Sequence, residues 1–262
     1  RDRFDAFKMD AEAVIADAKE TVTALIGSLD GYKTAYTTEI AAAKAEWDAI
    51  VDDYYSKELE GGLNQTLALG IINEFMADED IALGSAGSLP GDMQRLFRPK
   101  NRGTYHMEYG YSNMGYEVNG ALGAKLAKPD AEVYTFCGDG SFLMGHSELY
   151  TALQENLKIN VCLFDNMGWG CIENLQNNQG TDTFGTVFRA RNPVTGMLDG
   201  DEIDVDFAKI AEGYGAKGYT IRTSDELRAA LADAKKQTKS VLFDIKAVSY
   251  THLRAHETSL HL

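Results

Sequence analysis

Two short motifs hold the residues of this sequence that are best suited to chemistry. Asp139 lies in a Gly-Asp-Gly turn after the apolar run 132–136, and Asn166 follows the apolar run 159–164. Carboxylate, amide and carbonyl oxygens are the ligands that Mg²⁺ and Ca²⁺ prefer, whereas zinc prefers nitrogen and sulfur. We therefore expect the side chains of Asp139 and Asn166 and the carbonyl of Gly168 to hold a divalent cation. Each motif alone is an ordinary turn or helix cap, but their joint occurrence at two predicted strand ends is more specific.

The residues around Asp139 are also suited to an anion. Gly138 and Gly140 allow the chain to turn sharply and a ligand to approach the backbone closely. Ser141 and Phe142 begin a predicted helix, so their N–H groups point toward the same place with the positive end of the helix dipole. A cation beside a cluster of N–H groups predicts a diphosphate site.

A glycine-rich loop at residues 84–92 offers further N–H groups. It reads GSAGSLPGD and includes Gly87 and Ser88, which we expect to contact the same phosphates. Taken alone, a loop of Gly, Ser and Pro is equally well explained as an ordinary connection.

The elements that must position these residues alternate between helix and strand from Leu63 onward. This pattern predicts an α/β domain with a doubly wound parallel sheet. In such a sheet the carboxyl ends of the strands meet at one edge, where ligands bind, so Asp139 and Asn166 are expected to lie together. One helix is expected between the two motifs, and the remaining predicted helices are 64–75, 119–127, 205–212 and 223–236. The predicted strands are 81–83, 104–108, 132–136, 159–164, 216–221 and 241–246.

The two ends of the chain differ from this α/β domain, which we assign to residues 61–246. Residues 1–60 predict two helices, at 11–29 and 34–55, which we interpret as the end of a preceding central domain and a linker. Residues 247–262 continue no pattern and resemble translated adapter sequence, so we expect a non-native tail there. A metal site formed by the histidines of this tail is rejected for the same reason.

Composition limits the partners of the protein. The net charge is −15, from 40 acidic and 25 basic residues, which argues against nucleic acid or an anionic membrane as the main partner. No apolar run is long enough to span a bilayer. Three cysteines without a pairing pattern are typical of a reducing cytoplasm, where we expect the protein to be located.

The segment CGDGSF, with Asn166 27 positions beyond Asp139, resembles the thiamine-diphosphate-binding signature of the acetolactate synthase and pyruvate decarboxylase superfamily. The resemblance implies thiamine diphosphate as the cofactor, with Mg²⁺ bound by Asp139, Asn166 and Gly168. The family usually has Asn where this chain has Asp165, but the second Asn is the usual ligand and is present.

A second segment, SNMGYEVNGALGA, resembles the part of the synthases that reads Met-Gly-Phe-Gly-Leu-Pro. The resemblance implies that Met114 lies under the thiazolium ring and forces the cofactor into its bent shape, with ordinary core packing as the alternative. Asn119 stands where many relatives have Pro, which distinguishes this chain from a typical acetolactate synthase.

The segments EYGYSNMGYEVNGALGAKLA and FDNMGWGCIENLQ are most similar to the trihydroxycyclohexane-1,2-dione hydrolase family of inositol catabolism, a resemblance that extends over about residues 4–245. It implies hydrolysis of a C–C bond in a cyclic 1,2-diketone, with a 5-deoxyglucuronate product. The pyrimidine-binding domain of such enzymes, with its activating glutamate, would come from a partner subunit of a homo-oligomer. Because the chain begins at Arg1 within structured-looking sequence, we expect a fragment that is inactive by itself.

Several roles stay open at this point. Glu173 stands where decarboxylases place a catalytic glutamate, but a Glu on an early helical turn is equally often solvated. Trp169 and Cys171 could face substrate, and residues 177–193 could form a lid. The alternative activities are those of an acetolactate synthase-like carboligase or a 2-oxo-acid decarboxylase. An alternative of another class is a non-catalytic phosphate- or nucleotide-binding module.

Overall fold

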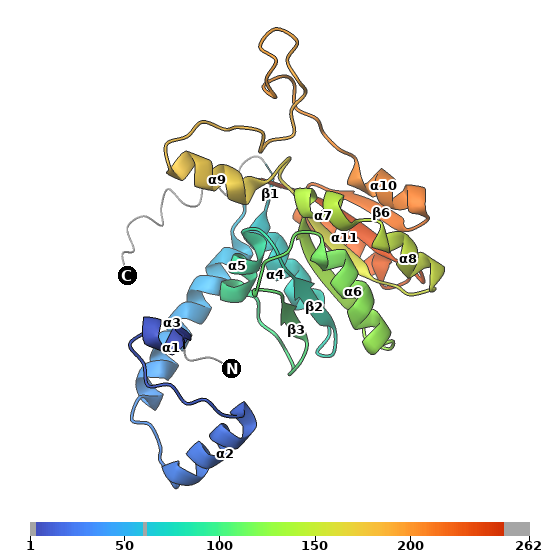
Figure 1. Cartoon of the computed structure of the whole chain (residues 1–262). Helices are drawn as coiled ribbons and strands as arrows, with labels where there is room; N and C mark the ends of the chain where they lie inside the picture. Colours follow the sequence, from blue (N-terminus) through green and yellow to red (C-terminus); the bar gives the residue numbers. More distant parts are fainter. Residues whose placement is uncertain (1–3, 60–61, 249–262) are drawn as a thin grey trace. The chain divides into compact units, whose positions relative to one another are not determined.

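The computed structural model describes residues 4–59 and 62–248, and the chain divides into two units, up to Ala49 and from Ile50 onward. The helices α1 (Phe4–Lys8) and α2 (Ala18–Leu29) belong to the first unit, and the division falls within α3 (Thr37–Ser56) (Figure 1).

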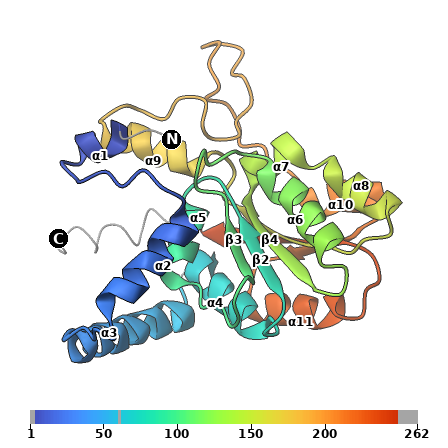
Figure 2. The same ribbon diagram turned by 60° about the horizontal axis from the view of Figure 1, so that its bottom comes forward.

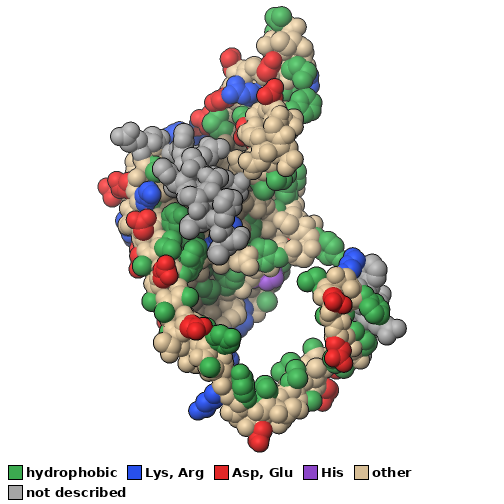
Figure 3. Space-filling model, turned by 90° about the vertical axis from the view of Figure 1, so that its left-hand side faces the viewer, with side chains coloured by type: hydrophobic (Ala, Val, Ile, Leu, Met, Phe, Trp, Pro, Cys, Tyr) green, Lys and Arg blue, Asp and Glu red, His purple; other side chains and the backbone are tan. Residues whose placement is uncertain are grey.

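Helix α2 begins later than its predicted start at residue 11. Asp17 caps it, because Oδ1 accepts hydrogen bonds from the backbone N–H groups of Lys19 at 2.9 Å and Glu20 at 3.2 Å. No side chain of α2 is buried, so its apolar stripe is exposed. On the face of the molecule that Figure 3 shows, exposed hydrophobic side chains occur among acidic ones.

The second unit is built on a seven-stranded sheet within the described residues, and every pair of neighbouring strands is parallel. The order is β1-β7-β5-β4-β2-β3, and β6 also pairs with β7. This arrangement confirms the predicted doubly wound α/β fold. The strands are β1 (Leu63–Asn64), β2 (Ile81–Gly84), β3 (Tyr105–Met107), β4 (Val133–Gly138), β5 (Asn160–Asp165), β6 (Lys217–Ile221) and β7 (Val241–Val248).

Helices cover both faces of this sheet (Figures 1 and 2). One face packs against α4 (Gln65–Phe75), α5 (Leu89–Leu96) and α11 (Ser224–Ala234). The other packs against α6 (Tyr116–Ala127), α7 (Asp139–Gly145), α8 (Glu148–Gln154) and α10 (Phe207–Tyr214). The remaining helix of the described residues, α9 (Gly170–Asn178), follows the loop at the end of β5.

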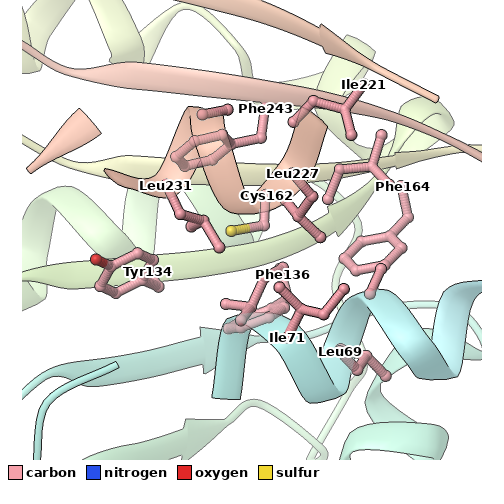
Figure 4. Packing of buried hydrophobic residues seen from close by; sticks show 14 of the residues in the cluster. Leu69, Ile71, Tyr134, Phe136, Cys162, Phe164, Ile221, Leu227, Leu231 and Phe243 are labelled. Atoms are coloured by element: carbon pink, nitrogen blue, oxygen red, sulfur yellow. The ribbon is translucent and has the colours of Figure 1, made fainter. Parts of the chain in front are cut away.

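The two cores follow from the period of two along each strand, which sends alternate side chains to opposite faces. In β4, Phe136 packs with the α4 side of the sheet and Cys137 with the α6 side. Figure 4 shows Ile71 of α4 directed toward Phe136. All six residues of β5 are buried, as expected for a central parallel strand covered on both faces.

The second unit also differs from the predicted elements in several places. Helix α5 starts at Leu89, so the glycine-rich loop is shorter than its predicted span of 84–92. The single helix expected between the two motifs is divided into α7 and α8 at His146 and Ser147. Strand β1, at Leu63–Asn64, was not predicted.

The predicted domain limits at residues 60 and 246 remain predictions. Glu60 and Gly61 lie outside the described residues, as does the predicted tail from residue 249 onward, with its three histidines. Ala247 and Val248 extend β7. Across residues 4–59 and 62–248, no helix has the length and apolar character that crossing a membrane would require.

Candidate functional site

A cavity of about 250 Å³ opens at the carboxyl edge of the sheet. The loops after β2, β4 and β5 form its walls, and these three strands are neighbours. The helix after β2 packs on one face of the sheet and the helix after β4 packs on the other, so the two connections diverge here. A crevice at such a switch point is the usual ligand site of an open parallel sheet.

Nine of the eleven predicted site residues line this cavity. They are Gly87, Ser88, Met114, Gly138, Asp139, Gly140, Ser141, Asn166 and Gly168.

Asp139 is the residue that joins the loops after β4 and β5. It is 1% exposed, and its Oδ2 accepts hydrogen bonds from the N–H groups of Asn166 at 3.1 Å and Gly168 at 2.9 Å. Its Oδ1 accepts from the N–H of Gly140 at 2.6 Å. The carboxylate therefore orders the main chain of both predicted metal-binding segments.

Burial raises the pKa of Asp139, the neighbouring Asp165 carboxyl raises this pKa further, and the N–H donors of Gly168 and Gly140 oppose the shift. The negative form is thus costly without additional positive charge nearby.

Trp169 closes the turn after β5 against Gly140. A Cβ atom at Gly140 would lie 2.5 Å from the indole Nε1, so only glycine fits there. The main chain of this turn pairs with the segment that follows α9, since Trp169 donates to Thr186 O at 2.8 Å and Phe188 donates to Met167 O at 2.8 Å. The predicted lid region thereby contributes a fixed support for the turn.

Beyond this support, residues 189–202 fold back on themselves. Ala190 donates to Asp201 O at 2.8 Å, and the side chains of Arg189 and Glu202 form an ion pair at 2.6 Å. Figure 1 shows this segment projecting away from the sheet.

Asp165, the departure from the family pattern, has a structural explanation. Its Oδ1 accepts from the N–H of Met167 at 2.9 Å, which holds Met167 at a φ of 64°. Its Oδ2 lies 2.5 Å from Nζ of Lys246. Lys246 Nζ also donates to Asp204 at 3.0 Å and lies 3.2 Å from Asp244. The lysine compensates the charge that Asp introduces in place of Asn.

Two predicted residues do not line the cavity. Phe142 is 1% exposed and packs edge-on against Phe207, with ring centroids 5.8 Å apart, so only its main chain is close to the site. Glu173 lies on α9, where its Oε1 accepts a hydrogen bond from Thr183 at 3.0 Å. Its catalytic role remains a prediction.

The cavity is also lined by residues whose role the sequence left open or did not indicate. Trp169 and Cys171, which could face substrate, line it. Gln65 and Ser112 line it as well, although neither was predicted to contact a ligand. Gln65 is held by the Asp92 carboxylate, which accepts from its Nε2 at 2.6 Å. No sequence signal pointed to Gln65, because its position depends on how α4 meets α5.

Glu117 is the most consequential residue that the sequence analysis missed. It lies in the first turn of α6, directly behind the cavity wall, and is 1% exposed. The sequence did contain a signal for this residue, namely a charged side chain among the small and apolar residues at the start of a predicted buried helix.

Comparisons with known proteins agree with this geometry. Residues 85–245 match the family described as thiamine pyrophosphate enzyme, C-terminal TPP binding domain. The chain is 47% identical to 3D-(3,5/4)-trihydroxycyclohexane-1,2-dione hydrolase of Geobacillus thermodenitrificans, 46% to that of Clostridium tetani and 48% to one from Bacillus cereus. Each alignment covers 99% of this chain but 44% of the relative, so the chain spans less than half the length of these curated relatives.

A solved structure shares the fold. The thiamine diphosphate-dependent 4-hydroxybenzoylformate decarboxylase of Rhodococcus jostii RHA1 is similar over 73% of this chain and 34% of its own, with a TM-score of 0.63 at 21% identity. Together with the match over residues 85–245, this places the chain in the family of thiamine pyrophosphate enzymes, through their C-terminal TPP-binding domain.

Proposed function

We propose that this chain supplies the diphosphate- and metal-binding part of a hydrolase that cleaves a C–C bond in a cyclic 1,2-diketone. The substrate would be trihydroxycyclohexane-1,2-dione and the product a 5-deoxyglucuronate, in inositol catabolism. The name shared by relatives at 46–48% identity supports this substrate. The observation that carries the proposal is the position of Asp139, which orders Asn166 and Gly168 at the wall of the cavity.

The residues present fit Mg²⁺. The Asp139 carboxylate, the Asn166 amide oxygen and the Gly168 carbonyl would hold the ion, and these are the hard oxygen ligands that it prefers. Asp139 is buried where its negative form is costly, and a divalent cation would supply the missing positive charge. Among the described residues, no three side chains of His, Cys, Asp or Glu gather as a metal site. A cation here would therefore draw on amide, carbonyl and diphosphate oxygens.

The other cavity residues divide the work of holding thiamine diphosphate, which when bound supplies a carbanion nucleophile and an electron sink. The N–H groups of Gly140 and Ser141 at the start of α7 would face the diphosphate. Gly87 and Ser88 would contact it from the opposite wall, and Met114 would support the thiazolium ring.

Further groups would come from outside this chain. We infer that a pyrimidine-binding domain on a partner subunit of a homo-oligomer supplies the carboxylate that activates the cofactor. We also infer that the enzyme is located in the cytoplasm. Glu173 would act as a catalytic carboxylate only if α9 brings it closer to the cavity.

Binding tests the proposal directly. Mg²⁺ with thiamine diphosphate, and Mg²⁺ with inorganic diphosphate, are titrated into the chain by calorimetry, with Mn²⁺ as a paramagnetic substitute for the metal. Inorganic diphosphate needs only this part of the site, so both ligands are expected to bind the wild type. Asp139→Ala is expected to abolish metal-dependent binding of both, whereas Asp130→Ala, the same change at an exposed loop position, leaves binding unchanged. Undiminished binding by Asp139→Ala contradicts the assignment.

The substrate is tested in the enzyme that contains this chain together with a pyrimidine-binding domain. Turnover of the cyclic dione but not of pyruvate supports the hydrolase, and the opposite result supports a carboligase or decarboxylase. A nucleotide that displaces thiamine diphosphate without any turnover would support the non-catalytic module.

A further inference from the structure

The carboxylate of Glu117 is buried behind the cavity wall and accepts three hydrogen bonds. Its Oε1 accepts from the N–H of Ala86 at 3.1 Å. Its Oε2 accepts from the N–H of Gly115 at 3.1 Å and from the hydroxyl of Ser141 at 2.7 Å. All three donors are neutral, so Glu117 does not owe its position to an ion pair with any of them.

The three donors belong to the three segments that follow β2, β3 and β4 around the cavity, which we call the three loops. Ala86 lies in the loop after β2, Gly115 in the loop before α6, and Ser141 in the first turn of α7 after β4. Each loop contributes cavity-lining residues, including Gly87, Met114 and Gly140. One side chain therefore connects the three segments that carry most of the predicted phosphate and thiazolium contacts.

The contacts between these loops are reinforced around Glu117. Ser141 Oγ accepts a second hydrogen bond from the N–H of Gly115 at 2.8 Å. The main-chain carbonyl of Glu117 accepts from the hydroxyl of Thr135 in β4 at 2.9 Å, which ties the first turn of α6 to the sheet. The start of α6 and the end of α7 approach so closely that a Cβ atom at Gly145 would collide with Gly115 O.

We propose that Glu117 is a positioning residue for the cofactor site. Its carboxylate holds the three loops at the spacing that the diphosphate and the thiazolium ring need, without itself touching the ligand. The inference rests on the proposed function for the identity of the ligand, whereas the effect on the loops can be measured without any ligand.

The chemistry of the side chain makes the proposal specific to a carboxylate. An ionised carboxylate accepts hydrogen bonds at both oxygens, whereas an amide has one acceptor oxygen and one donor NH₂ group. In Glu117→Gln the NH₂ group would face the N–H of Ala86 or that of Gly115, a contact between two donors. A size-matched change is therefore expected to separate at least one loop from the other two.

The test compares Glu117→Gln with the wild-type chain and with Glu212→Gln, the same change at an exposed helix position. Calorimetry with Mg²⁺-thiamine diphosphate and Mg²⁺-diphosphate is expected to show affinities about ten-fold or more weaker for Glu117→Gln, in line with the loss of a hydrogen bond to a charged group. Glu212→Gln is expected to match the wild type. Unchanged affinity with only a lowered unfolding temperature would overturn the proposal, because it would make Glu117 merely structural.

Amide hydrogen exchange of the ligand-free chain provides the second measurement. Glu117→Gln is expected to speed exchange in residues 86–88, 114–115 and 140–141 together, while the distant segment 189–202 is unaffected. If Glu117→Gln does not fold, Glu117→Asp keeps an acceptor at both oxygens but is one methylene shorter, and a smaller effect on the same three loops is expected. Exchange that changes in none of them, or uniformly over the chain, would refute the inference. A wild type that binds neither ligand would refute the proposed function but leave the exchange result to decide the role of Glu117.

Discussion

Replacement of Lys246 by Met is the perturbation for which the structure makes the sharpest prediction. The lysine side chain is 13% exposed, and two of its carboxylate neighbours are almost fully buried, Asp165 at 1% and Asp244 at 0%. The three ammonium hydrogens are used by Asp165, Asp204 and the carbonyl of Val205, with Asp244 at ion-pair distance. Met keeps most of the volume of Lys but removes the ammonium charge that compensates these carboxylates.

The expected loss in the free energy of unfolding is about 3–5 kcal/mol, the usual cost of leaving a buried charge without its partner. For a domain of this size it corresponds to a fall of roughly 10 °C in the unfolding midpoint. The loss should also depend on pH. Burial raises the pKa of Asp244 to about 6, and Lys246 lowers this pKa, so removing the lysine raises it further. A carboxyl whose pKa is higher in the folded state binds more protons there, so stability falls as pH rises between the unfolded and folded pKa values. The loss of unfolding free energy caused by Lys246→Met is therefore smallest near pH 4 and largest above pH 7.

Urea denaturation at pH 5 and pH 8 measures these values. Lys209→Met is the matched control, since its ion pair with Asp206 at 2.7 Å is exposed to solvent and should contribute little to stability. Asp165→Asn combined with Lys246→Met removes one of the buried charges and is expected to recover part of the loss. A loss for Lys246→Met no larger than that of the control, or one independent of pH, would refute the reasoning.

Three further predictions concern stability. Gly145→Ala is expected to destabilise the chain by about 1–3 kcal/mol because the new methyl group collides with Gly115 O. Gly123→Ala, in open space on α6, should stabilise it by up to about 1 kcal/mol. Equal midpoints of the two variants in thermal denaturation would contradict both predictions. Thr223→Ala removes a complete capping box at the start of α11 and should cost about 1 kcal/mol in chemical denaturation, a value that an unchanged midpoint would exclude. Asp244→Asn removes a carboxyl whose pKa is raised to about 6, so the decline of stability between pH 4 and 6 should become flatter, and an unchanged slope would assign that decline to other groups.

The main features of the site could be predicted because they depend on local sequence. The apolar runs before Asp139 and Asn166 define strands, and a parallel sheet brings the ends of its strands to one edge. The two residues are therefore close without any knowledge of the intervening chain, and the structure places the Asp139 carboxylate 3.1 Å from the N–H of Asn166.

The missed features depend on distant parts of the chain. Glu117 accepts hydrogen bonds from residues 31 positions before it and 24 after it, and nothing local indicates either partner. Asp165 differed from the family pattern without an apparent reason, because the lysine that compensates it lies 81 positions away. One predicted helix is divided into α7 and α8 directly after Gly145, which lies against Gly115 in a tertiary contact that the local sequence does not indicate.

Segment 189–202, whose two ends pair with each other, is a site where residues could be inserted into the protein. Its two ends are held together by the pairing of Arg189 with Glu202, so residues added between them extend a loop that is already closed. Doubling such a loop costs only about 0.6 kcal/mol in closure entropy. Val194 at its tip is 92% exposed, which makes this position suitable for a fluorescent label or an inserted tag. The hydrogen bonds of Thr186 and Phe188 to the turn around Trp169 would be retained, because both residues precede the paired ends of the segment.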